Sequence, residues 1–195
     1  MNSETVQQLM NSPIGKNLSA AEASELAQAG NTRSVGRDDA LFRIGDQGDA
    51  LFIILDGGVK VVLGNPLTGV KDIATLGPGQ VVGELEVMTK SLRVATVVAT
   101  QETTALEIGA AKLDSMLSEN SAAANKLVGS IARTLARRLA AVNQRLVARD
   151  PAPVAATAPS AKDANIANIG PIEVADADLV GIDDDDLDVL DKLWG

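Results

Sequence analysis

The sequence predicts an α+β fold in which an antiparallel β-barrel or jelly roll lies between N-terminal helices and one long C-terminal helix. Residues 40–108 contain short β-branched runs separated by glycine-rich turns, a pattern typical of closed or double-sheet antiparallel folds. Helical patterns flank this region on both sides, and an acidic segment follows the second of them. These observations predict one compact domain with appendages.

The first 30 residues are predicted to be helical. Ser19 and Glu22 form the pattern of a capping box, which predicts a helix over residues 20–29. Gly30 follows this stretch, and glycine commonly ends a helix.

The middle region predicts short strands joined by turns. Residues 51–55 and 59–63 are apolar runs on either side of Asp56-Gly57-Gly58, which predicts a β-hairpin. Gly64-Asn65-Pro66 and Gly77-Pro78-Gly79 predict further turns. Residues 110–117 are predicted to return to helix.

Residues 121–149 predict one long helix with Asn120 or Ser121 as its N-cap. Apolar residues recur along it at alternating steps of four and three: Val128, Ala132, Leu135, Leu139, Val142 and Leu146. This spacing is a heptad seam, from which we expect a homodimer. A second stripe, Leu127 and Ile131, is expected to cover the barrel. The alternative is that the seam itself lies against the barrel.

The composition changes after Arg149. Residues 150–181 are rich in Pro, Ala and Asp without apolar periodicity, which predicts a disordered linker. Residues 182–195 contain four consecutive aspartates and then four apolar residues that share one face of a helix: Leu187, Leu190, Leu193 and Trp194. We interpret this segment as an acidic docking peptide for a protein partner with an apolar groove rimmed by Lys or Arg. The alternatives are a segment that folds back on its own barrel and an inert acidic tail.

The composition also excludes several classes of function. The chain has no His, Cys or Tyr, so we expect neither an enzyme nor a metal site. No apolar run of membrane-spanning length and no signal-peptide pattern is present in the sequence, which favours the cytoplasm. Residues 150–195 hold 11 acidic and 2 basic residues, a net charge of −9 that equals the charge of the whole chain. This charge argues against nucleic-acid binding by the tail.

The strongest functional signal is Gly83-Glu84-Leu85 with Arg93 nine residues after Glu84. A glycine-led turn into a short helix presents backbone N–H groups to an anion. An arginine brought to the same place adds a charged donor fork, and a glutamate accepts hydrogen bonds from sugar hydroxyls. A ligand with phosphate and ribose fits these groups.

Together with the upstream run Gly45 to Val61, this motif resembles the cyclic-nucleotide-binding domain family, over residues from about 18 to 147. The resemblance implies the jelly roll of that family, with Glu84 on the ribose 2′-hydroxyl and Arg93 on the cyclic phosphate. It also implies a phosphate cradle of backbone N–H groups after Gly83, around Leu85, Glu86, Val94 and Ala95. The run Ala136-Arg137-Arg138-Leu139 is similar to the family's dimer helix, which implies that Asn143 reaches adenine; the alternative is a solvated or interhelical Asn143.

Three positions depart from the family pattern. Glu86 stands where Ala, Ser or Gly is usual, Leu92 replaces a frequent Pro, and Val94 replaces a small or hydroxylated residue. We expect a regulatory module that binds cyclic AMP in preference to cyclic GMP, because Val94 has no hydroxyl for guanine, and that signals to a protein partner through its C-terminal helix and tail. The alternative is a ligand-free adaptor in which Arg93 pairs with Glu84 or Glu86. DNA binding is not expected, since the family's helix-turn-helix has no counterpart after the long helix.

Overall fold

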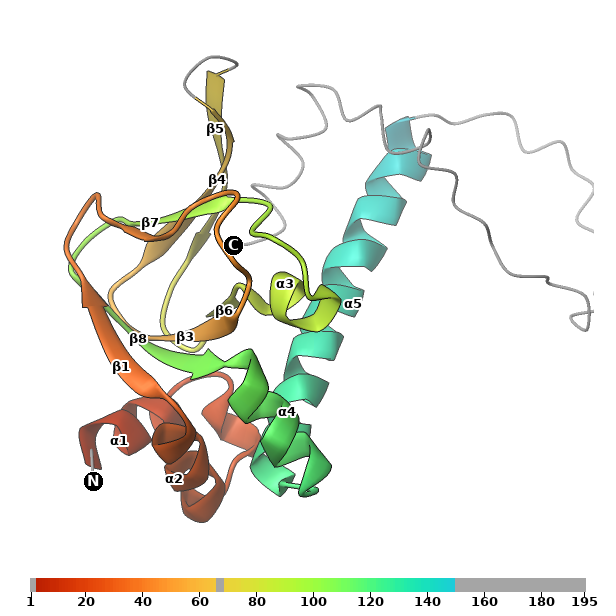
Figure 1. The fold of residues 1–195 in the computed structure, drawn as a ribbon. Helices are drawn as coiled ribbons and strands as arrows, with labels where there is room; N and C mark the ends of the chain where they lie inside the picture. Colours follow the sequence, from red (N-terminus) through yellow and green to blue (C-terminus); the bar gives the residue numbers. More distant parts are fainter. Residues whose placement is uncertain (1–2, 66–68, 150–195) are drawn as a thin grey trace, which may run out of the picture.

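The computed structural model describes residues 3–65 and 69–149. It contains a helical layer and a β layer with one long helix beside them (Figure 1). The helical elements are α1 (Ser3–Asn11), the 3-10 turn η1 (Gly15–Asn17), α2 (Ala20–Ala29), α3 (Glu84–Thr89), α4 (Ala110–Ser118) and α5 (Ala122–Arg149). The strands are β1 (Asn31–Val35), β2 (Ala40–Phe42), β3 (Ala50–Asp56), β4 (Val59–Asn65), β5 (Gly69–Leu76), β6 (Val81–Val82), β7 (Thr96–Ala99) and β8 (Thr103–Gly109).

The strands form two four-stranded antiparallel sheets, in the orders β1-β8-β3-β6 and β2-β7-β4-β5. All strand pairs in the described residues are antiparallel, and strands adjacent in the sheets are often distant in the chain. This arrangement is a jelly roll with helices at its base, and it confirms the predicted α+β class.

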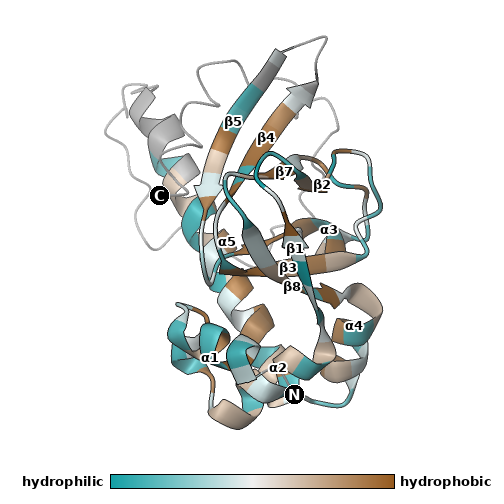
Figure 2. Cartoon of the chain, turned by 90° about the vertical axis from the view of Figure 1, so that its left-hand side faces the viewer, coloured by the Kyte–Doolittle hydropathy of each residue, from teal (hydrophilic) through white to brown (hydrophobic). Residues whose placement is uncertain are grey.

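Strand β3 is buried on both faces, which explains its nearly continuous apolar sequence. Its alternate residues point to opposite sides. Leu51, Ile53 and Leu55 pack with the helices, whereas Phe52 and Ile54 pack between the two sheets. Figure 2 shows the hydrophobic colouring concentrated on such strands and sparser on the outer sides of α1 and α2. The molecule therefore has two apolar cores, and β3 contributes side chains to both.

The predicted hairpin at Asp56-Gly57-Gly58 is wrong. Strands β3 and β4 flank these residues but pair in different sheets, so the turn carries the chain from one sheet to the other. Thr103 holds it there: Gly58 N–H donates to Thr103 Oγ1 at 3.0 Å, and the hydroxyl donates to Gly58 O at 2.9 Å. The hairpin in this part of the chain is β4–β5, and Gly64 and Asn65, predicted as turn residues, are instead the last residues of β4, paired with Val70 and Gly69.

The predicted helix ends are largely confirmed. Helix α2 starts with the complete Ser19–Glu22 capping box, and Gly30 follows its last residue. Ser121 caps α5, because its Oγ accepts the N–H of Ala124 at 3.1 Å. Glu22 also accepts a hydrogen bond from Lys126 at 2.7 Å, which joins the first turn of α2 to the first turn of α5.

Helix α5 does not separate its two predicted stripes cleanly. Leu127 and Ile131 are buried in the helical core as expected, but the seam residues Val128 and Leu135 are partly buried against the same core. This happens because a helix on a globular core buries a broad stripe rather than a narrow seam. Farther along, Leu139 is 62% exposed. The side chains of Val142 and Leu146, and the whole of residues 150–195 with the predicted linker and docking peptide, lie outside the described residues.

Candidate functional site

Gly83 connects β6 to α3 in a backbone conformation that favours glycine. Its φ is 74°, in the left-handed region. A Cβ at this position would lie 2.5 Å from Arg93 Nη1 and 3.2 Å from the Ala50 carbonyl oxygen. The sequence motif thus reflects two constraints at once, a reversed turn and the close approach of a buried guanidinium.

The two glycine-anchored blocks of the sequence lie directly against each other. Gly45 N–H donates to the Arg93 carbonyl at 2.8 Å, and Arg93 N–H donates to the Asp46 carbonyl at 2.9 Å. A Cβ on Gly48 would lie 2.4 Å from both Glu86 Cβ and the Ser91 carbonyl oxygen. The first block therefore forms a wall that holds residues 86–93 in place.

Arg93 is buried, with 3% of its surface exposed. Its Nη1 donates to the Gly83 carbonyl at 3.1 Å and its Nη2 to the Ala50 carbonyl at 2.5 Å. The guanidinium lies over the Phe42 ring at 4.2 Å from the centroid. Its Nε has no hydrogen-bond partner among the described residues. Backbone carbonyls and an aromatic ring thus fix this cation inside the barrel.

Glu86 supplies the carboxylate that faces this cation. One oxygen lies 3.4 Å from Arg93 Nη1, and the other accepts the backbone N–H of Val94 at 3.2 Å. Glu86 is 4% exposed. The arginine fork and the Val94 N–H are two of the donors that the family resemblance assigns to the ligand phosphate. In this structure a side chain of the protein uses both.

Glu84, two residues earlier, turns toward α5 instead. It is 5% exposed, and its Oε1 accepts a hydrogen bond from Arg138 at 3.4 Å. Burial raises the pKa of Glu84, with the backbone and Arg138 opposing the shift, and burial lowers the pKa of Arg138. The sequence pointed to Arg138 only through a dimer-helix pattern, and its contact with the cassette (residues 83–95) was missed.

The remaining predicted site residues are divided by the fold. Leu85 and Val94 are exposed, and Ala95 is buried between the sheets. Asn143 is exposed on α5, and within the described residues no hydrogen bond joins it to the cassette. The structure thus brings Gly83, Glu84, Glu86, Arg93 and Val94 together and leaves Asn143 apart; ligand roles for these residues stay predictions.

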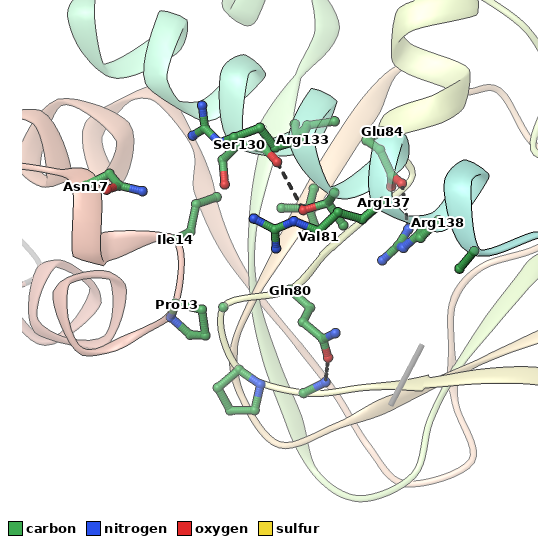
Figure 3. A pocket seen from close by; sticks show the side chains of 16 residues that line it. Pro13, Ile14, Asn17, Gln80, Val81, Glu84, Ser130, Arg133, Arg137 and Arg138 are labelled. Carbon is green, nitrogen blue, oxygen red and sulfur yellow. Dashed lines mark hydrogen bonds and ion pairs between the residues drawn. The ribbon is translucent and has the colours of Figure 1, made fainter. Parts of the chain in front are cut away.

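A cavity of about 840 Å³ lies on the outer side of the cassette. Its walls are Pro13, Ile14 and Asn17, the turn 77–81 and one face of α5, and Glu84 and Arg138 line one end of it (Figure 3). No group of acidic residues in residues 3–65 and 69–149 is placed to hold a metal ion. None of the helices in the same ranges has the length and apolarity needed to cross a membrane.

Comparison with known proteins identifies the family of this fold. The family model described as "Cyclic nucleotide-binding domain" matches residues 32–120. The N-terminal domain of a transcriptional regulator from Streptomyces coelicolor A3(2) is 30% identical with a TM-score of 0.56, over 66% of this chain and 91% of that one.

Two longer proteins also match. The regulatory subunit of a cAMP-independent protein kinase A from Trypanosoma brucei is 29% identical with a TM-score of 0.57, over 66% of this chain and 45% of that one. A variant of that subunit with three substitutions is bound to cAMP in its A site. Lysophospholipase nte1 from Aspergillus fumigatus is 30% identical over 141 residues, which are 71% of this chain and 9% of the enzyme. The chain therefore spans a small part of the enzyme and less than half of the subunit.

Proposed function

The chain belongs to the cyclic nucleotide-binding domain family, and from this premise we propose that it is a regulatory module that works without a cyclic nucleotide. The observation that carries the proposal is the Glu86 carboxylate, which bonds Arg93 and the Val94 N–H. Arg93 Nη1 and the Val94 N–H therefore already have a partner in the protein itself.

A cyclic phosphate meets two obstacles at this position. It must break the buried Glu86–Arg93 pair, and it then places its negative charge near the released carboxylate. Two like charges 4 Å apart repel by about 4 kcal/mol at an effective dielectric of 20. Because Glu86 belongs to the same chain, it also occupies the position without the entropy loss that a free ligand incurs.

A relative supports the same interpretation. In the trypanosome variant that is bound to cAMP, an alanine replaces a glutamate, an arginine replaces a threonine seven residues later, and an alanine replaces the valine that follows. Glu86, Arg93 and Val94 have this same spacing. This chain combines the glutamate and valine of the cAMP-independent subunit with the arginine of the cAMP-bound variant.

The module would then act by assembly. Leu139 is exposed on the seam face of α5, which supports a homodimer through that helix, and the acidic segment that follows supports a protein contact. In this proposal the Glu84–Arg138 pair holds α5 against the cassette. This fixed contact replaces the movement of α5 that ligand binding would cause.

Calorimetry with cyclic AMP and cyclic GMP tests the proposal. We expect no binding heat from the wild-type protein at millimolar nucleotide, and a gain of cyclic AMP binding in the double variant Glu86→Ala/Val94→Ala. The matched control is Glu25→Ala, an exposed glutamate on α2, which should stay silent. If neither protein binds, Glu86 is not the reason for the lack of response.

The second candidate is a cyclic AMP sensor in which Glu86 swings aside. Its supporting observations are the retained Glu84 and Arg93 and the unpartnered Arg93 Nε. Wild-type binding in the micromolar range, roughly −8 kcal/mol, with cyclic AMP preferred over cyclic GMP, would establish this candidate and reject the first.

A further inference from the structure

The cavity on the outer side of the cassette has no role in the proposed function. It lies between the N-terminal helices and α5 (Figure 3), and its described lining includes Glu84 but not Glu86. Its floor is apolar, with Ile14 and Ile131 almost fully buried and Val81 half-buried. At about 840 Å³, it has the size of a binding site rather than of a packing defect.

The charge of the cavity is uncompensated. Arg133, Arg137 and Arg138 line it from α5, and Glu84 is its one acidic lining residue in the described part of the chain. Glu84 pairs with Arg138. Arg133 and Arg137 are exposed and make no ion pair with any described residue. They stand four residues apart on one helix face, where like charges repel, so an anionic occupant would stabilise this face.

The chain itself carries the matching negative charge. Residues 1–149 have no net charge, whereas residues 150–195 carry −9. Six of the acidic residues lie within ten positions: Asp183, Asp184, Asp185, Asp186, Asp188 and Asp191. Leucines and the single Trp194 stand among and after them, which suits a site with an apolar floor and a cationic rim.

The length of the chain permits this contact. Arg137 lies 12 residues before Arg149, about 18 Å along a helix. The roughly 30 residues between Arg149 and the acidic segment span about 30 Å if they behave as a flexible chain. A segment tethered in this way has an effective concentration near the millimolar range, which favours it over a free acidic peptide with the same contacts.

We propose that residues 182–195 dock into this cavity of their own chain, with the aspartates against Arg133 and Arg137 and the apolar residues, including Trp194, on the floor. This inference is independent of whether the cassette takes a nucleotide. A segment docked there would contact the Glu84–Arg138 end of the cavity and stabilise the junction of the cassette and α5. The same docking would withhold the acidic segment from a protein partner.

A zero-length cross-link tests the contact in the full chain. The variant Arg137→Lys keeps the charge and provides an amine, which carbodiimide joins to a nearby carboxylate. We expect mass spectrometry to find residue 137 linked to an aspartate between Asp183 and Asp191. The matched control is Arg43→Lys, an exposed arginine outside the cavity, for which no such link is expected.

Mixing isotope-labelled and unlabelled protein identifies the donor of the segment. Links within one chain support the proposal. Links that join labelled to unlabelled chains overturn it in favour of a second copy as the occupant, and the absence of any link to residues 183–191 overturns it outright.

Tryptophan fluorescence provides a second measurement that needs no chemical cross-link. Trp194 is the only tryptophan and the chain has no tyrosine, so the emission reports on this segment alone. We expect a blue-shifted emission protected from acrylamide in the wild type, and loss of both properties in Arg133→Gln/Arg137→Gln but not in Arg37→Gln/Arg43→Gln. A wild-type emission already equal to that of the urea-unfolded chain would contradict the proposal.

Discussion

The inner and outer walls of the cassette hold two similar ion pairs in different ways. On the inner wall, Glu86 and Arg93 are both nearly inaccessible, and carbonyls and a backbone N–H make further hydrogen bonds to them. On the outer wall, Glu84 pairs with Arg138, whose side chain is 15% exposed, and burial raises the pKa of Glu84. Residues two apart on a helix point to different sides, so one short helix serves both walls.

The difference shows that similar pairs can have different tasks. The inner pair is fixed by groups on three segments of the chain, so removing either partner leaves a buried charge without compensation. The outer pair stands between the barrel and α5 at the edge of a cavity, and burial raises the pKa of its glutamate. The inner wall is therefore suited to stabilising one structure. The outer wall is suited to responding to pH or to an occupant of the cavity.

The largest expected effect is the loss of the inner arginine. Arg93→Ala leaves Glu86 buried and unpaired, which should lower the free energy of unfolding by about 3–5 kcal/mol. Arg138→Ala should cost less, about 1–2 kcal/mol, as for a buried acceptor that loses its donor, because Arg138 is partly exposed and burial raises the pKa of Glu84. Urea denaturation measures both. Equal losses of unfolding free energy for the two variants would mean that the inner and outer pairs contribute equally to stability.

A rescue experiment sharpens this result. Arg93→Met combined with Glu86→Leu removes both charges of the inner pair, and buried pairs replaced by apolar residues of similar volume often lose little stability. We expect the double variant to be more stable than Arg93→Ala. If it is less stable, the carbonyls of Gly83 and Ala50 depend on the guanidinium more than the carboxylate does.

The turn that separates the two walls should be the next most sensitive position. Gly83→Ala forces a side chain into the left-handed region and against Arg93 Nη1, with an expected cost of about 2–3 kcal/mol. Gly45→Ala is a matched control, because its φ is 87° but its Cβ would meet nothing within 4 Å; backbone strain alone should cost about 1 kcal/mol. Thermal unfolding of the two variants compares these costs, and equal shifts would mean that the contact with Arg93 contributes nothing.

Some of these features could be predicted from the sequence and others could not. The capping box at Ser19, the end of α2 at Gly30 and the start of α5 after Ser121 follow from local hydrogen bonding, and all three were predictable. The placement of β3 and β4 in different sheets was not predictable. Asp56-Gly57-Gly58 has the residues of a hairpin turn, but Thr103, distant in the chain, holds it in another conformation.

The candidate site shows the same division. The sequence identified Glu84 and Arg93 and singled out Glu86 as unusual, with pairing to Arg93 as one alternative. It could not place the Glu86 carboxylate on the Val94 N–H, because that geometry depends on the wall formed by residues 45–50. The partner of Glu84 on α5 was equally hidden, since 54 residues separate Glu84 from Arg138.

A test of the outer side concerns assembly rather than folding. Leu139→Asp should convert a homodimer to a monomer in sedimentation, because a carboxylate in an apolar seam is costly. Since Leu139 is 62% exposed in the single chain, the unfolding free energy of the monomer should change by no more than about 0.5 kcal/mol. Ala140→Asp, also exposed but off the seam, should leave the dimer intact. A wild-type monomer at tens of micromolar would contradict the seam.

The smallest expected effect is a pH dependence at the base of α5. Lys126 and the Ser19 N–H lower the pKa of Glu22 to about 2, whereas burial shifts the pKa of Glu84 upward. A lowered pKa stabilises the fold above the ordinary glutamate range, and this contribution disappears as the pH falls toward 2. Glu84 has the opposite sign, because its contribution is lost as the pH rises through its raised pKa. Lys126→Met should flatten the acid limb of the stability–pH curve. An unchanged acid limb would show that Glu22 does not contribute to the loss of stability at low pH.

The position of Arg93 over the Phe42 ring has a consequence for spectroscopy. Ring currents should move the resonances of this one side chain away from those of the solvated arginines, and its buried Nε–H should exchange slowly with water. Displacement of Glu86 from the guanidinium would change both the chemical shift and the exchange rate. Arginine-labelled protein would therefore report, through a single cross-peak, which carboxylate or phosphate sits beside that cation.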